Sequence, residues 1–211
     1  MRRFRLDPAG LPFIGGALAV TLAVSATTRP IYGLPFGLLT AFFAFFFRDP
    51  ERAVHGGSND VLSPADGRVL VAGAAEPGVA PPGAWQQISI FLSPMDVHVN
   101  RVPASGRITR VTYQAGRFLP AYHEQAAGTN ERSEIWIDHG GQFVVARQIV
   151  GILARRVVCR AQEGAEVRAG DRYGIMKFGS RMDIFVPTSA DIRVQVGQAV
   201  RGGETIIAVL H

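Results

Sequence analysis

The chain has 211 residues, a formal net charge of +5 and only 18% charged residues, so it is apolar for a soluble domain. This length accommodates one core-bearing domain and an appendage. The single cysteine, Cys159, excludes an internal disulfide, and no Cys/His/carboxylate spacing predicts a metal site. The net positive charge is compatible with a nucleic acid or an anionic membrane as partner. No basic block is interleaved with aromatic residues, so the apolar N-terminus favours a membrane, and we expect no nucleic-acid partner.

The first 52 residues are predicted to form a hydrophobic helical hairpin. Two apolar stretches, Leu11–Ala26 and Ile31–Phe47, are separated by a short break that contains Arg29 and Pro30. Each stretch is slightly shorter than the ~20 apolar residues that cross a bilayer comfortably. Arginines at both outer flanks predict that both ends lie in the cytoplasm. Arg29 at the tip also fits a hairpin that only dips into the interface, so both modes of insertion stay open.

The same N-terminus also has features of a secretory signal. Arginines precede an apolar core, and Val24-Ser25-Ala26 is typical of a cleavage site. Export would leave the second apolar stretch at the new N-terminus without an evident role, which favours the hairpin.

Residues 53–211 are predicted to form a β-rich domain, so the fold class is mainly β (α+β). Short runs rich in β-branched or aromatic residues alternate with Gly, Pro, Asp and Asn. Two segments, Ala75–Ala84 and Arg117–Arg132, are predicted loops, and the length of the second makes it a candidate loop over a substrate site. The candidate strands are Gly67–Ala72, Gln87–Leu92, Gly106–Tyr113, Ser133–His139, Gln142–Ile149, Arg156–Cys159, Gly174–Phe178, Met182–Val186, Asp191–Val194 and Thr205–Val209.

A tandem pattern marks the C-terminal part of the chain. The motif G-x-x-V-x-x-G-[DE] occurs at residues 164–171 and again at 197–204. Such a pair resembles the two halves of a lipoyl/biotinyl-type barrel-sandwich, so we expect a compact unit from Ile149 to Leu210. In a carrier domain of that kind the central hairpin displays a modifiable lysine, for which Lys177 is the candidate.

The middle of this expected unit contains Gly179-Ser180, which by itself is an ordinary turn signal. The Ser180 hydroxyl is also placed to attack the Gly179 carbonyl, since glycine has no Cβ to block the approach. Such an attack needs a base, because a free serine hydroxyl is a poor nucleophile. His98 is the best candidate base, although a lone histidine is more often a packed or surface residue.

Asp66 has two compatible interpretations. The Asp66-Gly67 step is an ordinary turn dipeptide. A carboxylate on that turn can also orient His98 and stabilise its imidazolium, as in Ser-His-Asp catalysis.

Four segments, in this order, resemble the short form of phosphatidylserine decarboxylase proenzymes. They are FRDPER at 47–52, SPADGRV at 63–69, LSPMDVHVNRVP at 92–103 and KFGSRMDIFVP at 177–187. The resemblance implies self-cleavage between Gly179 and Ser180 into chains 1–179 and 180–211, with Ser180 becoming a covalent pyruvoyl group. It further implies decarboxylation of phosphatidylserine to phosphatidylethanolamine and CO₂ through a Schiff base. The partners are then the membrane lipid and the two cleaved chains as a heterodimer, with further dimerisation left open.

The same resemblance suggests roles for individual residues. It makes His98 the catalytic histidine, with Asp66 completing the constellation. Longer members have His-x-x-His where this chain has Arg101, so either His98 serves both reactions or another group takes one of them. Arg101 is also a candidate for binding the substrate's phosphate or carboxylate. Glu131 and Arg132, in an Asn-Glu-Arg element, are further candidates for lining the site.

Two other function classes stay open. The tandem repeat alone fits a membrane-tethered, non-enzymatic carrier module that is uncut and modified at Lys177. Ser180, His98 and Asp66 also fit an exported serine hydrolase with an intact Gly179–Ser180 bond. For the decarboxylase, we expect a catalytic domain on the cytoplasmic side of the cell membrane, held there peripherally or by the hairpin.

Overall fold

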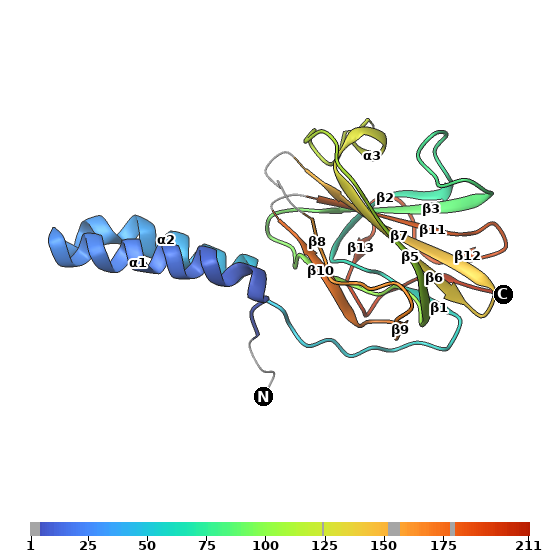
Figure 1. The fold of residues 1–211 in the computed structure, drawn as a ribbon, viewed down its shortest axis with the longest axis horizontal. Helices are drawn as coiled ribbons and strands as arrows, with labels where there is room; N and C mark the ends of the chain where they lie inside the picture. Colours follow the sequence, from blue (N-terminus) through green and yellow to red (C-terminus); the bar gives the residue numbers. More distant parts are fainter. Residues whose placement is uncertain (1–4, 124, 152–156, 178–179) are drawn as a thin grey trace. The chain divides into compact units, whose positions relative to one another are not determined.

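The computed structural model describes residues 5–123, 125–151, 157–177 and 180–211 (Figure 1). The chain divides into two compact units, Met1–Glu51 and Arg52–His211. The sequence-based expectation for Gly179 lies outside the described residues, as does the start of the strand expected from Arg156.

The N-terminal unit is a pair of antiparallel helices. A short 3₁₀ turn, η1 (Pro8–Gly10), leads into α1 (Leu11–Thr27), and α2 (Pro30–Phe46) returns alongside it. Pro30 opens α2, where its missing N–H costs nothing. The helices pack closely because Gly33 lies against Ser25 without an intervening side chain. The stretch Pro8–Thr27 is long and apolar enough to cross a membrane, and α2 is shorter.

The second unit is built from short strands and one helical turn, α3 (Ala126–Thr129). Its strands are β1 (Asp60–Leu62), β2 (Gly67–Ala74), β3 (Trp85–Leu92), β4 (Val99–Arg101), β5 (Gly106–Gln114), β6 (Arg132–His139), β7 (Gln142–Val150), β8 (Val157–Cys159), β9 (Glu166–Val167), β10 (Arg172–Met176), β11 (Ser180–Pro187), β12 (Asp191–Ile192), β13 (Ala199–Val200) and β14 (Ile206–Val209). The predicted helix pair followed by a mainly β domain is confirmed.

Within the described residues the strands form three sheets. The largest has eight strands in the order β13-β2-β3-β11-β7-β6-β5-β9, and two three-stranded sheets have the orders β1-β14-β12 and β4-β10-β8. All the pairings are antiparallel. β11 lies in the middle of the large sheet, paired with β3 on one side and with β7 on the other.

The strand orders show that this unit contains two corresponding halves. From the centre of the large sheet outwards, β11, β3, β2 and β13 correspond to β7, β6, β5 and β9. The small sheets correspond in the same way, β1-β14-β12 with β4-β10-β8. The half made of β4 to β10 is continuous in sequence. It is inserted between β3 and β11 of the other half.

The connection between the two central strands differs between the halves. β6 and β7 are joined by the two-residue turn Gly140-Gly141, in which both residues have positive φ as a tight hairpin requires. At the corresponding position β3 and β11 are joined by the whole inserted half. Ser180, the first residue of β11, is therefore the counterpart of Gln142, the first residue of β7.

A short sequence repeat supports this correspondence. PADGRV at 64–69 leads into β2, and PASGRI at 103–108 leads into β5. Gly67 and Gly106 have φ values of 154° and 151°, and a Cβ on either would collide with a carbonyl oxygen of the neighbouring strand. Both copies therefore need glycine where the chain enters the sheet.

The tandem G-x-x-V-x-x-G-[DE] pattern has one copy in each half, because β9 pairs with β5 and β13 with β2. The expected barrel-sandwich unit from Ile149 to Leu210 is not confirmed. β11, β13 and β14 from this stretch pair with β3, β2 and β1, which lie outside it. The repeat comes from two interlocked halves, so sequence proximity did not indicate which strands pair.

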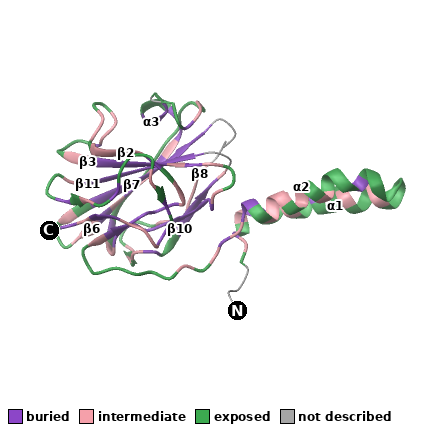
Figure 2. Ribbon diagram, turned by 180° about the vertical axis from the view of Figure 1, so that it is seen from behind, coloured by how far each residue is buried: buried purple, intermediate pink, exposed green. Residues whose placement is uncertain are grey.

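The hydrophobic core fills the space between the core face of the large sheet and the two small sheets. Ile88, Ile90, Ile135, Ile184 and Met182 are all fully buried in it. Figure 2 shows the buried residues concentrated in the strands of this unit, whereas α1 and α2 are mostly exposed or intermediate. Alternation along β11 therefore directs Met182 and Ile184 to the core and Arg181 and Asp183 to the opposite, outer face.

Other local expectations can be compared directly. The loop predicted at Ala75–Ala84 is confirmed, since β2 ends at Ala74 and β3 begins at Trp85. The 117–132 segment contains α3 as its single helical turn within the described residues. The sequence did not indicate β9 and β13, which have two residues each and exist only through pairing with a neighbouring strand.

We predict that Gly67→Ala destabilises the protein more than Gly73→Ala. Both glycines lie on β2 with φ near 150°, but only a Cβ at Gly67 meets the Phe91 carbonyl, whereas Gly73 faces open space. Backbone strain is common to both variants, and the collision should add about 1–3 kcal/mol at Gly67. Urea unfolding followed by circular dichroism measures the difference, and equal losses would contradict this prediction.

Candidate active site

Ser180 is the first residue of the central strand β11. It pairs with Leu92 on β3 and Val150 on β7, and its side chain is on the core face together with Met182. The residue is fully buried, and within the described residues its hydroxyl has no hydrogen-bond partner. Buried hydroxyls are nearly always bonded, so an unpartnered one at a strand end is an unusual feature that calls for an explanation.

His98 is tied to both chain segments that lead to Ser180. The loop that carries it leaves β3 directly after Leu92, the cross-strand partner of Ser180. Its backbone carbonyl accepts a hydrogen bond of 3.2 Å from Met176, the last residue of β10, four residues before Ser180. His98 is fully buried. The backbone of His98 is therefore connected to both of the chain segments that flank Ser180.

The His98 ring is oriented by the backbone of its own loop. Nδ1 lies 3.0 Å from the carbonyl oxygen of Asp96, which can only accept, so Nδ1 carries the proton and Nε2 is the basic nitrogen. The Asp96 carboxylate in turn accepts hydrogen bonds of 2.8 Å from both the backbone N–H and the hydroxyl of Ser93. This loop therefore fixes the tautomer that a general base requires.

Asp66 contacts a different part of the domain. Its carboxylate accepts 2.7 Å from Arg52 and 2.8 Å from the backbone N–H of Gly202. Within the described residues no hydrogen bond joins Asp66 to His98. The expected carboxylate–imidazole pair is thus not formed, and the Asp96 carbonyl is the acceptor on Nδ1 instead.

Arg101 lies at the same end as Asp66. Its backbone N–H donates to the Pro64 carbonyl, and its buried guanidinium donates 3.0 Å to the carbonyl of Gly170. Val99 and Asn100 lie between it and His98 in the chain. Arg101 therefore joins β4 to the turn before β10.

The Asn-Glu-Arg element is adjacent to the end of β7. Asn130 donates 2.8 Å to the Val150 carbonyl, and the Glu131 carbonyl accepts from the Val150 N–H. Val150 is the cross-strand partner of Ser180, so Glu131 lies one strand away from it. Asn130 also bonds both backbone groups of Leu119, which attaches the 117–132 loop to the sheet. The sequence motif indicated this element but not the anchoring role of its asparagine.

Arg132 belongs to the outer face of the large sheet, opposite to the core. There Arg181 pairs with Asp183 at 2.6 Å and Arg147 pairs with Glu134 at 2.6 Å, all with little exposure. Burial lowers the pKa of Arg132, and the nearby Arg147 lowers it further, against the opposing charges of Glu134 and Asp183. A polar cavity of about 240 Å³ lies beside Arg132, Arg147 and Glu134. Arg132 therefore faces a charged environment on the side away from Ser180.

The loop between β2 and β3 covers part of this outer face. The carbonyl of Val79 accepts a hydrogen bond of 2.5 Å from Arg147. Glu76 lies 3.5 Å from Arg181, and its backbone N–H donates to Gln87. Charges that would otherwise face solvent are thereby enclosed, which requires that they be paired.

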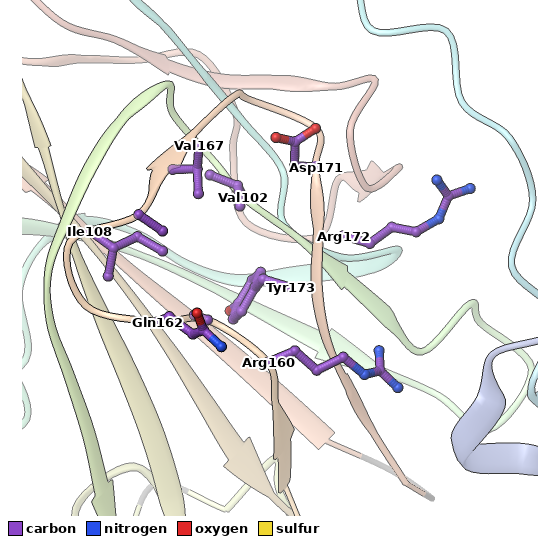
Figure 3. Close-up of a pocket in the computed structure, with 10 residues that line it drawn as sticks. Val102, Ile108, Arg160, Gln162, Val167, Asp171, Arg172 and Tyr173 are labelled. Carbon is purple, nitrogen blue, oxygen red and sulfur yellow. The ribbon is translucent and has the colours of Figure 1, made fainter.

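A second cavity, of about 380 Å³, lies beside Tyr173 (Figure 3). Figure 3 shows the ring between the apolar side chains of Ile108 and Val167 on one side and Arg160 and Arg172 on the other. The Tyr173 hydroxyl reaches the Met182 sulfur at 4.0 Å, and burial, with a smaller contribution from Cys159, raises its pKa well above the usual value. Tyr173 thus connects this cavity to β11, two residues from Ser180.

Comparison with known proteins identifies the family. The sequence profile of the family described as phosphatidylserine decarboxylase matches residues 39–208. A phosphatidylserine decarboxylase proenzyme of Saccharopolyspora erythraea is 43% identical over 212 residues, covering 97% of this chain and 88% of that protein. Proteins of the same description from Pelodictyon phaeoclathratiforme and Nitrosomonas europaea are 41% and 38% identical, covering 90% and 96% of this chain and 92% and 94% of their own lengths.

These matches extend over nearly the whole chain, and the relatives have similar lengths. They agree with the four motifs read from the sequence and with a buried serine at the head of a central strand. The chain belongs to the phosphatidylserine decarboxylase family.

Proposed function

We propose that Ser180 is the residue at which this proenzyme cleaves itself and from which its pyruvoyl group arises. A phosphatidylserine decarboxylase proenzyme is a carboxy-lyase precursor with a serine-derived pyruvoyl group. The observation that carries the assignment is the buried hydroxyl of Ser180 at the start of β11, which has no hydrogen-bond partner among the residues that the structure describes. A small side chain in this enclosed position fits both a nucleophile that attacks the preceding peptide bond and the methyl group that the serine side chain becomes in the pyruvoyl group.

The proposed cleavage starts with attack of the Ser180 oxygen on the carbonyl of the preceding residue. A C–O bond forms, the peptide C–N bond breaks, and the hydroxyl proton moves to the released nitrogen. Nε2 of His98 is the proposed carrier of that proton. Its neutral tautomer, held by the Asp96 carbonyl, supports this role. A base then removes the Cα proton of residue 180, and the ester oxygen leaves with the upstream chain as its carboxylate. The dehydroalanine that remains takes up water and releases ammonia, which gives the pyruvoyl group.

In the mature enzyme the pyruvoyl group supplies a carbonyl that takes up the substrate amine and accepts electrons as CO₂ leaves. The chain itself would exclude water, because residue 180 is enclosed by the core side chains of β3 and β7. His98 would return the proton to the product carbon. We propose that Glu131, one strand away, lines the same space.

The remaining predicted residues receive other proposed roles. Asp66 and Arg101 support the domain around the turns at Gly202 and Gly170, because their polar atoms are engaged there. Arg132 takes part in the charged outer face.

We further propose that the apolar N-terminal unit holds the enzyme at the cytoplasmic face of the membrane. Pro8–Thr27 is long and apolar enough to span, and α1 and α2 expose large apolar side chains such as Leu22 and Leu38. A diacyl lipid does not leave the bilayer readily, so an anchored site avoids its extraction. The net positive charge would raise the local density of an anionic substrate.

Two alternatives make different predictions about the chain. A carrier module would remain uncut and be modified at Lys177, and a serine hydrolase would also keep its peptide bond before Ser180. The family membership favours the self-cleaving enzyme over both.

We predict that Ser180→Ala stays a single 211-residue chain without decarboxylase activity. The parent should give two chains, 1–179 and 180–211, with a pyruvoyl mass at the start of the smaller one. Intact-mass spectrometry measures both outcomes. Ser133→Ala, which changes another buried serine, should still be cut. Cleavage of the Ser180→Ala chain would refute the assignment.

We predict that the two cleaved chains stay together under native conditions. Residues 180–211 contain β11 to β14, which pair with β3, β7, β2 and β1 of the larger chain. Native size-exclusion chromatography should give one peak that contains both chains, and denaturant should be needed to separate them. Loss of the small chain in native buffer would show that this pairing does not hold the product together.

We predict that the full chain sediments with phosphatidylserine-containing vesicles even in about 1 M salt, where surface charge is screened to about 3 Å. Salt does not weaken the insertion of apolar helices, so binding by that route should persist. Protein that moves to the supernatant as salt rises would instead indicate attachment by charge alone.

A further inference from the structure

Two buried amide side chains lie in the core near Ser180 and have no role in the reaction described above. Asn100 is the middle residue of β4, and Gln148 is on β7. Both are fully buried. Their side chains bond each other, with Gln148 Nε2 donating 2.8 Å to Asn100 Oδ1. No sequence motif indicated that these two residues form a pair.

The pair leaves hydrogen-bonding capacity unused. Within the described residues, Asn100 Nδ2 and Gln148 Oε1 have no hydrogen-bond partner. Exchanging nitrogen and oxygen in both amides leaves the same inventory, one amide N–H₂ and one amide oxygen. Leaving such groups unsatisfied in a core is costly, and native proteins keep few of them.

The pair is placed next to residue 180. Gln148 is the cross-strand partner of Met182, and Val150, two residues further along β7, is the partner of Ser180. Gln148 and Ser180 are therefore diagonal neighbours on the core face, within about 7–8 Å between backbones. Asn100 faces them from the small sheet, where it pairs with Gly174. A Cβ on Gly174 would touch the Gln148 amide, so this glycine leaves room for it.

The other half of the domain shows that the fold does not need these amides. Val61, the middle residue of β1, corresponds to Asn100, the middle residue of β4. Val186, seventh in β11, corresponds to Gln148, seventh in β7. Both valines are fully buried members of the hydrophobic core. One half of the domain therefore has valines at these two positions, and the other half has the amides that lie near residue 180.

We propose that Asn100 and Gln148 are positioning residues that orient the Ser180 hydroxyl for its attack on the preceding peptide bond. The proposal rests on the assignment of Ser180 made above. A serine hydroxyl is both a hydrogen-bond donor and an acceptor. The pair has one spare acceptor and one spare donor, so it can bond the hydroxyl before it attacks. Because amides do not titrate, this assistance is independent of pH, unlike proton transfer by His98.

The test is the double variant Asn100→Leu/Gln148→Met, which keeps side-chain volume and removes both amides. Replacing both partners of a buried hydrogen bond by apolar groups is nearly neutral or stabilising, so the variant should unfold at the parent's temperature or above. Self-cleavage should slow by about tenfold to a hundredfold, as for loss of one donor to a group that develops charge. The pH profile of cleavage should keep its shape. Gln87→Leu, a buried amide on the outer face of β3 with partners at both ends, is the matched control and should be cut normally.

The outcomes separate the two proposals. A parent chain that is never cut refutes the assignment of Ser180, whatever the variants do. A parent that is cut, with a folded double variant cut at the same rate, overturns the role of the amide pair. If the double variant does not fold, Asn100→Asp replaces it, because that change preserves shape and the bond to Gln148 but removes the spare donor. Slow cleavage in a folded Asn100→Asp chain supports the proposal, and cleavage at the parent's rate overturns it.

Discussion

The pairing of β11 with strands on both sides is the constraint on which the rest of this structure depends. β3 and β7 bond the strand along most of its length, so Ser180 is held at its head by two neighbours. A central strand is covered on its core face by the hydrophobic core and here also on its outer face by paired charges. Residue 180 is therefore kept away from water by the sheet itself. The same ladders hold the strand in place when the chain before it is cut.

The interlocked halves explain why Ser180 does not follow a simple hairpin turn. In the inserted half, β6 and β7 are joined by a two-residue glycine turn, which connects the two strands directly. In the other half the inserted half replaces that turn, so β11 begins where a long excursion of the chain ends. The start and the end of that excursion meet where the N–H of Met176 donates to the carbonyl of His98. The interruption of a simple hairpin supplies the space for a site within an otherwise regular sheet.

The placement of charge divides the predicted residues into separate groups. Ser180 begins β11, His98 bonds the last residue of β10, and Glu131 bonds Val150 at the end of β7. Asp66 and Arg101 bond the backbone of the turns at Gly202 and Gly170. Arg132 belongs to the outer face, where burial and the neighbouring Arg147 lower its pKa. Neighbouring residues of one motif, such as Glu131 and Arg132, therefore have different surroundings, because the direction and face of a strand decide where each side chain points.

The sequence by itself determined the apolar N-terminal helix pair, the β-rich domain and the four motifs that indicate the family, because these depend on local composition and spacing. It also singled out Ser180 and His98, whose residue types carry the chemistry. Only the tertiary structure decided that Asp96, through its carbonyl, orients His98, and that Asp66 pairs with Arg52. It alone brought Asn100 to Gln148 and assigned the tandem repeat to two different halves. Such contacts join residues far apart in the chain, and the pairing of strands sets them, which no local pattern encodes.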